Sequence, residues 1–266
     1  FIMLDTLFDK IYVIWGRDPL RMEYIKNHFS KRNIENYKFI HSITPEELFT
    51  KSKKIRFQGL WNVDACKPPD AIKSVRCGSP YPLSLGEVCC SYGHLKAWKT
   101  AICDGVNSFL VIEDDAVIDE ELCTDALQWK EYMPEDWDII HFHSWRAFGG
   151  AREPELTKKR KQINDYFYTG FKEYGGTVCY SLTSSIAKIL LANYYPIHLP
   201  SDGITAQLSN TSFSRKYYNA YVFYPFLCTN TIFESQIDTE KQISKKYFTR
   251  QQRYNLSKVK FDPTVL

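Results

Sequence analysis

The sequence predicts an α/β fold with a mostly parallel central sheet and helices on both faces. Strand-like runs and helix starts alternate along the chain, as they do in such folds. The run from Phe109 to Ile112 is apolar on both sides, which is typical of a central strand. With 266 residues and 44% hydrophobic content, the chain can bury a large core. We expect one domain over residues 1–266, with a basic, aromatic tail or flap from about 239 to 266.

The first elements predict a β-α-β unit. Residues 11–15 form a β-rich run, and Asp18 followed by Pro19 is an N-cap with proline at the first helical position. The residues expected to form the buried stripe of that helix are Leu20, Tyr24, Ile25 and Phe29. A second strand is predicted at 37–40.

Two capping boxes mark the next helix starts, Thr44 to Glu47 and Ser84 to Glu87. Between them, 51–82 is rich in Lys, Pro, Gly and Ser and reads as a long surface loop. The second box opens a helix whose expected apolar side is Val88, Tyr92, Leu95, Trp98 and Ile102.

The alternation continues to about residue 224. Asp119 is the expected N-cap of a helix that runs to about Met133. The segment 144–174 is expected to leave the sheet. The further elements predicted are strands at 138–143, 177–182 and 221–224, and a helix at 184–191.

Composition excludes several classes of protein. The formal charge of +3, from 34 basic and 31 acidic residues, is too balanced for a dedicated nucleic-acid binder. No apolar stretch approaches the roughly 18 residues of a membrane-spanning helix, so we expect no transmembrane segment. The eight cysteines show no CxxC pair, so no zinc site is expected.

The compartment stays open between the cytosol and the ER or Golgi lumen. Cys66 and Cys77 bracket a loop and could pair in an oxidising compartment. Asn210 and Asn255 begin glycosylation sequons, which would be used only in a secretory lumen.

The most informative feature is the end of the apolar strand, where Glu113, Asp114 and Asp115 follow Ile112 directly. Burying three adjacent carboxylates would be costly, so they are expected at the strand's exit. Ligands of open α/β sheets bind beyond the carboxyl ends of the strands, and clustered oxygen ligands suit Mg²⁺ or Mn²⁺ with a phosphorylated substrate. The alternative is a solvated acidic turn.

Four stretches, taken in order, resemble glycosyltransferase family 25, the family of lipooligosaccharide glycosyltransferases and collagen hydroxylysine galactosyltransferases. They lie between about Ile11 and Ser235 and are Tyr12-Val-Ile-Trp-Gly-Arg-Asp-Pro-Leu-Arg21, Leu85-Gly-Glu-Val-Cys-Cys-Ser-Tyr-Gly-His-Leu95, Leu110-Val-Ile-Glu-Asp-Asp115 and Gly175-Gly-Thr-Val-Cys-Tyr-Ser181. The resemblance implies a GT-A-type nucleotide-sugar-binding fold, a divalent metal, and inverting transfer of a sugar from a UDP-linked donor to a hydroxyl.

The chain departs from the family pattern at three places. The arginine-rich helix of the first motif keeps only Arg17 and Arg21. Gly93 stands where the second motif usually has Ser, and the carboxylate usual after the second strand is replaced around His41 and Ser42. Donor contacts from these positions are therefore in question.

The resemblance also implies roles for the acids. Asp115 would hold Mn²⁺ or Mg²⁺, and His198 is a further candidate ligand because neutral imidazole suits Mn²⁺. Glu113 and Asp114 would lie near the ribose and the transferred sugar. Asp202, in a proline-bracketed loop, is the candidate base that takes the proton of the acceptor hydroxyl; its alternative role is a helix N-cap.

The remaining donor contacts are weaker hypotheses. His94 lies in the family's second motif and is otherwise a structural histidine. Gly176 and Thr177 would let the backbone approach the donor sugar, or simply form a turn into the strand. Arg17 and Arg21 are the candidates on the phosphate side.

These inferences predict a metal-dependent hexosyltransferase that uses a UDP-hexose and a glycan or hydroxylated protein acceptor. Galactose or glucose is the expected sugar, with N-acetylglucosamine also possible. One rival is a non-catalytic glycosyltransferase-like binding or adhesion module, which would be expected to lack the acidic triplet. Another is a nucleotidyltransferase, which would need a glycine-rich phosphate loop where the sequence has only Gly16.

Overall fold

The structure is a computed structural model. It describes residues 4, 7–44, 47, 85–144, 161–170, 176–194, 197, 200–203, 205 and 218–229. The predicted loop at 51–82, the basic tail, both sequons and the pair Cys66 and Cys77 lie outside the described residues. No helix in the described part is long and apolar enough to span a bilayer.

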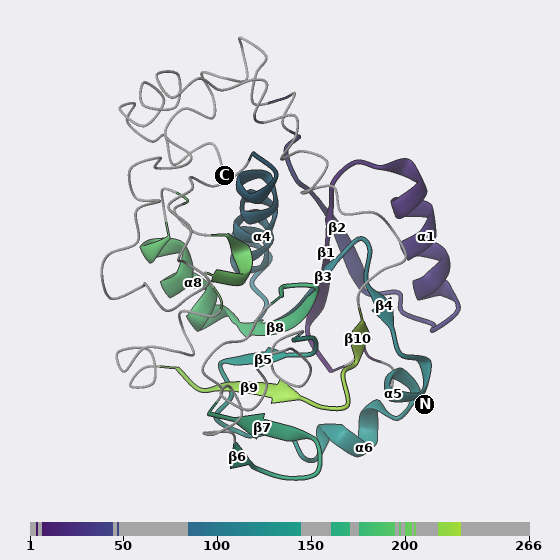
Figure 1. Cartoon of the computed structure of the whole chain (residues 1–266), viewed down its shortest axis with the longest axis vertical. Coiled ribbons are helices and arrows are strands. Elements are labelled where there is room, and N and C mark those ends of the chain that lie inside the picture. The colour runs from purple at the N-terminus through teal and green to yellow at the C-terminus, as the bar shows by residue number, and fades with distance from the viewer. Residues whose placement is uncertain are drawn as a thin grey trace, which may run out of the picture.

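An eight-stranded sheet forms the centre of the described structure, in the order β2-β1-β3-β8-β5-β9-β7-β6 (Figure 1). A second sheet pairs β10 with β4. The strands are β1 (Lys10–Trp15), β2 (Tyr37–His41), β3 (Ser108–Glu113), β4 (Val117–Ile118), β5 (Ile139–His141), β6 (Lys161–Gln162), β7 (Phe167–Thr169), β8 (Cys179–Thr183), β9 (Ala220–Phe223) and β10 (Cys228–Thr229).

Six of the eight strands point the same way. Strand β1 pairs in parallel with β2 and β3, and β5 pairs in parallel with β9. Strand β8 lies between β3 and β5 and is antiparallel to both, and β7 opposes β9 and β6. The expectation of a mostly parallel sheet is confirmed, with β8 and β7 as the reversed strands.

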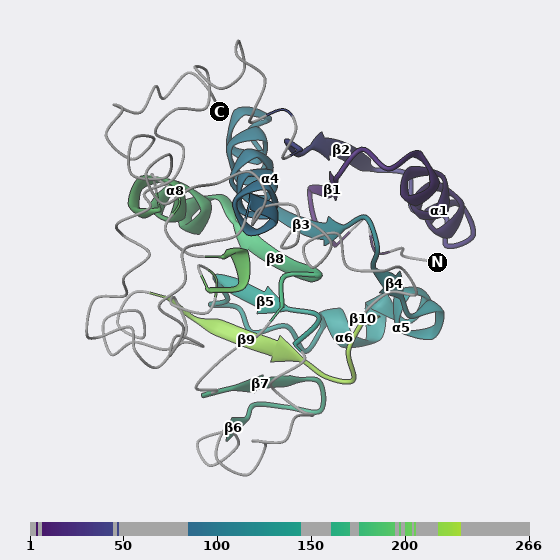
Figure 2. The same cartoon turned by 45° about the horizontal axis from the view of Figure 1, so that its top comes forward.

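Helices cover both faces of this sheet, as predicted (Figures 1 and 2). The helices α4 and α8 pack on one face with Tyr12, Phe109, Val111 and Tyr180. The helix α1 and the short helices α5 and α6 pack on the other face with Ile11, Val13, Leu110 and Ile112. The helix bounds are α1 (Pro19–Ser30), α4 (Leu85–Cys103), α5 (Glu120–Thr124), α6 (Ala126–Lys130) and α8 (Ser184–Asn193).

Helix α1 begins as the sequence predicts but buries a different stripe. The Asp18 side chain accepts a hydrogen bond from the Leu20 amide, and Pro19 is the first helical residue. Ile25 and Phe29 are buried, as expected. Leu20 is 71% exposed, so its place in the buried stripe was wrong; the buried residue of that turn is Arg21. The cause is the acidic triplet, which lies against this turn.

The helix signals at Thr44 and Asp119 are confirmed with one correction, and Ser84 of the second capping box lies outside the described residues. Thr44 and Glu47 exchange the two side-chain-to-amide hydrogen bonds of a capping box. Asp119 caps the helix after the acids, but the single helix predicted to Met133 is two short ones, because the chain breaks at Asp125. In α4, the predicted apolar side is buried at Val88, Tyr92, Leu95 and Trp98.

Gly93 explains how closely α4 approaches the sheet. A Cβ atom there would lie 2.7 Å from Cγ2 of Ile14 and 3.1 Å from Oγ of Ser42. The Ser42 hydroxyl occupies this space and donates to the carbonyl of Cys89 on α4. The two departures from the family pattern, at positions 93 and 42, are therefore neighbours in space, and a serine at 93 would not fit beside Ser42.

Candidate functional site

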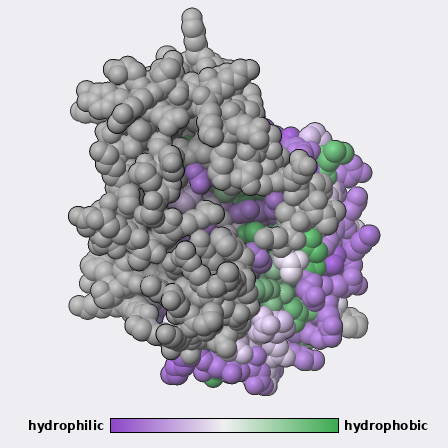
Figure 3. Space-filling model, viewed as in Figure 1, coloured by the Kyte–Doolittle hydropathy of each residue, from purple (hydrophilic) through white to green (hydrophobic). Residues whose placement is uncertain are grey.

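The carboxyl ends of β1 and β3 meet at one edge of the sheet because these strands are parallel. Strand β8 runs the other way, so its beginning, preceded by Gly176 and Thr177, lies at the same edge. The amide of Glu113 donates to the carbonyl of Val178, which fixes this register. Predicted site residues from three separate motifs therefore lie at this end of the sheet. Figure 3 shows a hollow with hydrophilic residues near the middle of this face.

Asp114 ties the acidic triplet to the start of α1. One carboxylate oxygen accepts from the Gly16 amide at 2.9 Å and the other from Nη1 of Arg21 at 3.1 Å. Burial raises the pKa of Asp114 above its ordinary value, and these two donors oppose that rise. Both oxygens are thus engaged by the protein. The contact of Asp114 with the donor sugar stays a prediction.

Asp115 has one oxygen engaged and one available. Oδ2 accepts from Nη1 of Arg21 at 3.0 Å, whereas Oδ1 is buried and has no hydrogen-bond partner among the described residues. Burial and the neighbouring charge of Glu113 raise the pKa of Asp115 to about 7, although Arg21 opposes this shift. A buried carboxylate oxygen without a donor is costly, and a divalent cation is a group that would satisfy it.

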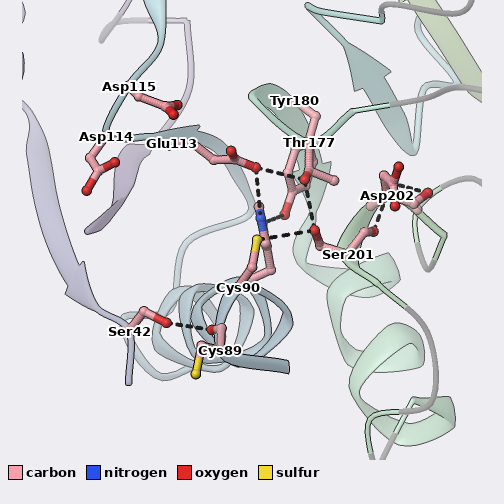
Figure 4. A network of polar contacts seen from close by, with 12 residues as sticks. Ser42, Cys89, Cys90, Glu113, Asp114, Asp115, Thr177, Tyr180, Ser201 and Asp202 are labelled. Atoms are coloured by element: carbon pink, nitrogen blue, oxygen red, sulfur yellow. Dashed lines mark hydrogen bonds and ion pairs between the residues drawn. The ribbon is translucent and has the colours of Figure 1, made fainter. Parts of the chain in front are cut away.

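Glu113 points the other way, toward α4 and the start of β8 (Figure 4). Its Oε1 lies 3.2 Å from Nε2 of His94 and accepts from Oγ1 of Thr177 at 2.8 Å. Burial acts to raise the pKa of Glu113, but these hydrogen bonds and the nearby imidazole outweigh it, and the net shift is downward. Glu113 is therefore held as a carboxylate.

Two chains of hydrogen-bond donors converge on Glu113. Nε1 of Trp98 can only donate, and it donates to Oη of Tyr180 at 2.9 Å. Nδ1 of His94 lies 2.8 Å from this phenol oxygen, and Nε2 lies 3.2 Å from Oε1 of Glu113. Because the Glu113 carboxylate can only accept, we assign a proton to Nε2 of His94, so that Nε2–H donates to Glu113 and neutral Nδ1 accepts from the Tyr180 hydroxyl.

The second series of hydrogen bonds begins at Cys90 on α4 and passes through Ser201, in the segment 200–203, to Thr177 and Glu113. The Thr177 hydroxyl gives its single proton to Glu113, so Ser201, at 3.0 Å from Thr177, donates to it. Sγ of Cys90 lies 3.5 Å from the Ser201 hydroxyl and completes the chain. Figure 4 shows these contacts as dashed lines from Cys90 to Ser201, from Ser201 to Thr177 and from Thr177 to Glu113.

Asp202 follows Ser201, which is linked through Thr177 to Glu113. Residues 201–203 are helical, and the Thr205 hydroxyl donates to the Ser201 carbonyl, so Asp202 lies inside a helical turn and not in an open loop. Its charge acts on the Cys90 thiol. The structure thus brings Asp202 near the triplet. Its role as a base remains a prediction.

The other predicted residues have four different surroundings. Arg21 and His94 are buried in the site, with the contacts described above. Arg17, which has a positive φ of 72°, pairs with Glu47, and its side chain is 42% exposed. Gly176 also has a positive φ, 89°, which requires glycine before Thr177. The candidate metal ligand His198 lies outside the described residues.

The structure adds four residues that sequence reasoning missed. Cys90, Tyr180 and Ser201 belong to the donor chains, and His143, after β5, is buried close enough for the Glu113 charge to act on its pKa. The signal available in the sequence was the spacing of Cys90 and His94. Residues four apart on a helix lie on one face.

The family described as "Glycosyltransferase family 25 (LPS biosynthesis protein)" matches residues 8–205, and the chain belongs to this family. The resemblance found in the sequence motifs and the GT-A-type α/β architecture that it implied are thereby confirmed.

A curated relative supports the same class. A Haemophilus influenzae protein named "Putative glycosyltransferase" is 26% identical over 175 residues, which cover 64% of this chain and 52% of the relative. The chain therefore spans about half the length of that protein.

Two solved structures are distant in sequence. A glycosyltransferase involved in glycosylation of the major capsid of PBCV-1 is 10% identical with a TM-score of 0.40, covering 89% of this chain and 99% of that one. A UDP-glucose pyrophosphorylase complexed with UDP-glucose is 13% identical with a TM-score of 0.40, covering 90% and 80%.

Proposed function

We propose that this glycosyltransferase is metal-dependent and inverting, and that it moves a hexose from a UDP-sugar to a hydroxyl of a glycan or a hydroxylated protein side chain. The observation that carries the proposal is the Oδ1 atom of Asp115. This buried carboxylate oxygen has no hydrogen-bond partner among the described residues, and it lies beside two further acids at the end of β3. Membership of the family supplies the class of reaction.

Asp115 is the residue that would hold Mn²⁺ or Mg²⁺, and Arg21 sets its orientation through Oδ2. When bound, the cation neutralises charge that grows on the leaving diphosphate. Arg21 is itself buried and pairs with Asp114 and Asp115, so its proposed role is to orient these two acids and not to bind phosphate. Arg17 remains the proposed contact on the phosphate side.

Glu113 acts as a fixed hydrogen-bond acceptor. His94 and Thr177 both donate to its Oε1, which keeps the carboxylate ionised and in one orientation. Its other oxygen is the proposed acceptor for a hydroxyl of the donor. Gly176, next to Thr177, has a positive φ, a backbone conformation that favours glycine.

Asp202 is the proposed general base. An inverting transfer needs a carboxylate that takes the acceptor proton while the oxygen attacks the anomeric carbon from the face opposite UDP. The link from Ser201 through Thr177 to Glu113 connects this segment to the proposed donor contact Glu113. Such a link would keep the base and the donor in register.

The experiment compares Asp115→Asn, Asp202→Asn and Asp119→Asn with the parent chain. Asp119 is a nearby acid that caps α5, and Asn also caps helices, so this control should remain folded. UDP release is measured with Mn²⁺, a panel of UDP-sugars and candidate acceptors, and Mn²⁺ binding is measured by electron paramagnetic resonance.

We expect Asp115→Asn to lose Mn²⁺ binding and transfer together, and Asp202→Asn to keep Mn²⁺ and lose transfer. The Asp119→Asn variant should match the parent. If Asp115→Asn binds Mn²⁺ and releases UDP as the parent does, the proposal is wrong. UDP-sugar binding by the parent without transfer to any acceptor or to water would instead support the non-catalytic binding module.

A further inference from the structure

Cys90, His94 and Glu113 form a compact group of three different metal-ligating side chains. Cys90 and His94 are one turn apart on α4, and Glu113 comes from the end of β3. One ligand atom from each residue lies within 4.8 Å of the other two. Within this group, Nε2 of His94 and Oε1 of Glu113 are only 3.2 Å apart.

We propose that Cys90, His94 and Glu113 bind a thiophilic divalent cation of the Zn²⁺ class, at a site separate from the oxygen ligand Asp115. The inference stands on the placement of these three residues; because it uses His94 and Glu113, a bound cation would replace the hydrogen bond by which His94 orients Glu113 in the proposed transfer site.

The donor set separates this site from a magnesium or manganese site. A thiolate, an imidazole and a carboxylate together favour Zn²⁺, whereas Mg²⁺ and Mn²⁺ prefer oxygen ligands. Bonds of about 2.3 Å to sulfur and about 2.0 Å to nitrogen and oxygen place tetrahedral ligands roughly 3.3 to 3.6 Å apart. A separation of 4.8 Å would have to contract by about 1.2 to 1.5 Å to reach that geometry, whereas the 3.2 Å between His94 and Glu113 is already close to it.

The surroundings of His94 fit a ligand. Its Nδ1 lies 2.8 Å from the Tyr180 hydroxyl, and Tyr180 is fixed in turn by Trp98. A metal-bound histidine donates its second ring N–H, so on binding a cation through Nε2, His94 would donate from Nδ1 to the Tyr180 oxygen. His94 is completely buried, whereas Cys90 and Glu113 are partly exposed.

Binding can be written with its protons balanced. The Cys90 thiol releases its proton to solvent as sulfur binds the cation. The ring proton of His94 moves from Nε2 to Nδ1 and Nε2 binds the cation; the Tyr180 hydroxyl proton turns away from Nδ1, so that the phenol oxygen accepts from both Nδ1–H of His94 and Nε1–H of Trp98. Glu113 is already a carboxylate and needs no change of protonation. The Ser201 hydroxyl, 3.5 Å from Cys90 Sγ, or a water supplies the fourth position.

Cysteine spacing alone could not indicate this site. The eight cysteines contain no CxxC pair, and zinc was not expected from them. The group uses one cysteine with ligands of two other types, and Glu113 joins the helix pair only through the packing of α4 on the sheet.

The test is a titration of the reduced full chain with Co²⁺, a spectroscopic substitute for Zn²⁺. A thiolate ligand gives a charge-transfer band in the near ultraviolet, and tetrahedral geometry gives visible bands. We expect these bands in the parent and in Cys103→Ser, which changes an exposed cysteine on the same helix. We expect Cys90→Ser to lose the charge-transfer band and to weaken Zn²⁺ binding by more than about 100-fold.

A second measurement uses the parent chain alone and needs no variant to fold. Cys90 is alkylated with N-ethylmaleimide in the presence of Zn²⁺, Mn²⁺ or EDTA, and the modified site is read by mass spectrometry. Zn²⁺ should protect Cys90, and Mn²⁺ should not. Absence of the cobalt band in the parent, its persistence in Cys90→Ser, or equal alkylation in all three conditions would overturn the proposal.

Discussion

Replacing Arg21 by alanine tests the arrangement of the acidic triplet most directly. Nη1 of Arg21 lies 3.1 Å from Asp114 and 3.0 Å from Asp115, and the arginine side chain is 6% exposed. Removing it leaves two buried carboxylates without their cation. Breaking such a buried pair costs about 3 to 5 kcal/mol. For a chain of this size we expect the melting temperature to fall by roughly 10 °C.

The loss should depend on pH in a definite direction. The folded-state pKa of Asp115 is about 7, above the ordinary carboxyl value of about 3.9 that applies when the chain is unfolded. Between these values the folded chain holds a proton that the unfolded chain lacks, so stability falls as pH rises through this window. Arg21 opposes the upward shifts of Asp114 and Asp115, so its removal matters most once both are ionised.

The assay is urea unfolding in EDTA at about pH 5 and about pH 8, with Arg17→Ala as the matched control. The Arg17 side chain is 42% exposed and pairs with Glu47, so its loss should cost less than about 1 kcal/mol. We expect Arg21→Ala to be several-fold more destabilising at the higher pH. An equal loss at both pH values, or one no larger than that of Arg17→Ala, would refute the reasoning.

Three further substitutions test other contacts. Tyr180→Phe removes the acceptor of the buried Trp98 indole and should cost about 1 to 3 kcal/mol in urea unfolding; no measurable change would contradict the donor chain. Gly93→Ala places a methyl group 2.7 Å from Ile14 and should lower stability by about 1 to 3 kcal/mol, and a neutral result would show that α4 can retreat. Asp119→Ala removes an N-cap and should cost about 1 kcal/mol, measured by thermal melting, with unchanged stability as the contrary outcome.

The sequence predicts the elements well because their signals are local. Asp18 with Pro19, and Thr44 with Glu47, fix helix starts within four residues, and the structure has the corresponding hydrogen bonds. The apolar run of β3 likewise predicts a buried central strand, which the structure confirms. The edge of the sheet at which the acids lie follows from the parallel direction of β1 and β3.

The errors come from contacts between distant parts of the chain. Leu20 fits a buried stripe by spacing, but Arg21 is buried because its partners lie 93 and 94 residues further along. The reversal of β8 depends on how the segment before it returns to the sheet, which no local signal encodes. The donor chain from Trp98 to Glu113 likewise joins α4, β8 and β3, and needs all three in place.

The position of β3 between β1 and β8 has a consequence for motion. Its amides are hydrogen-bonded on both sides by neighbours that are themselves interior strands, so they should exchange with deuterium only when the whole molecule opens. Glu113 ends this strand and Asp114 and Asp115 follow it directly, so the acids should lie beside amides that exchange slowly within the described part of the chain.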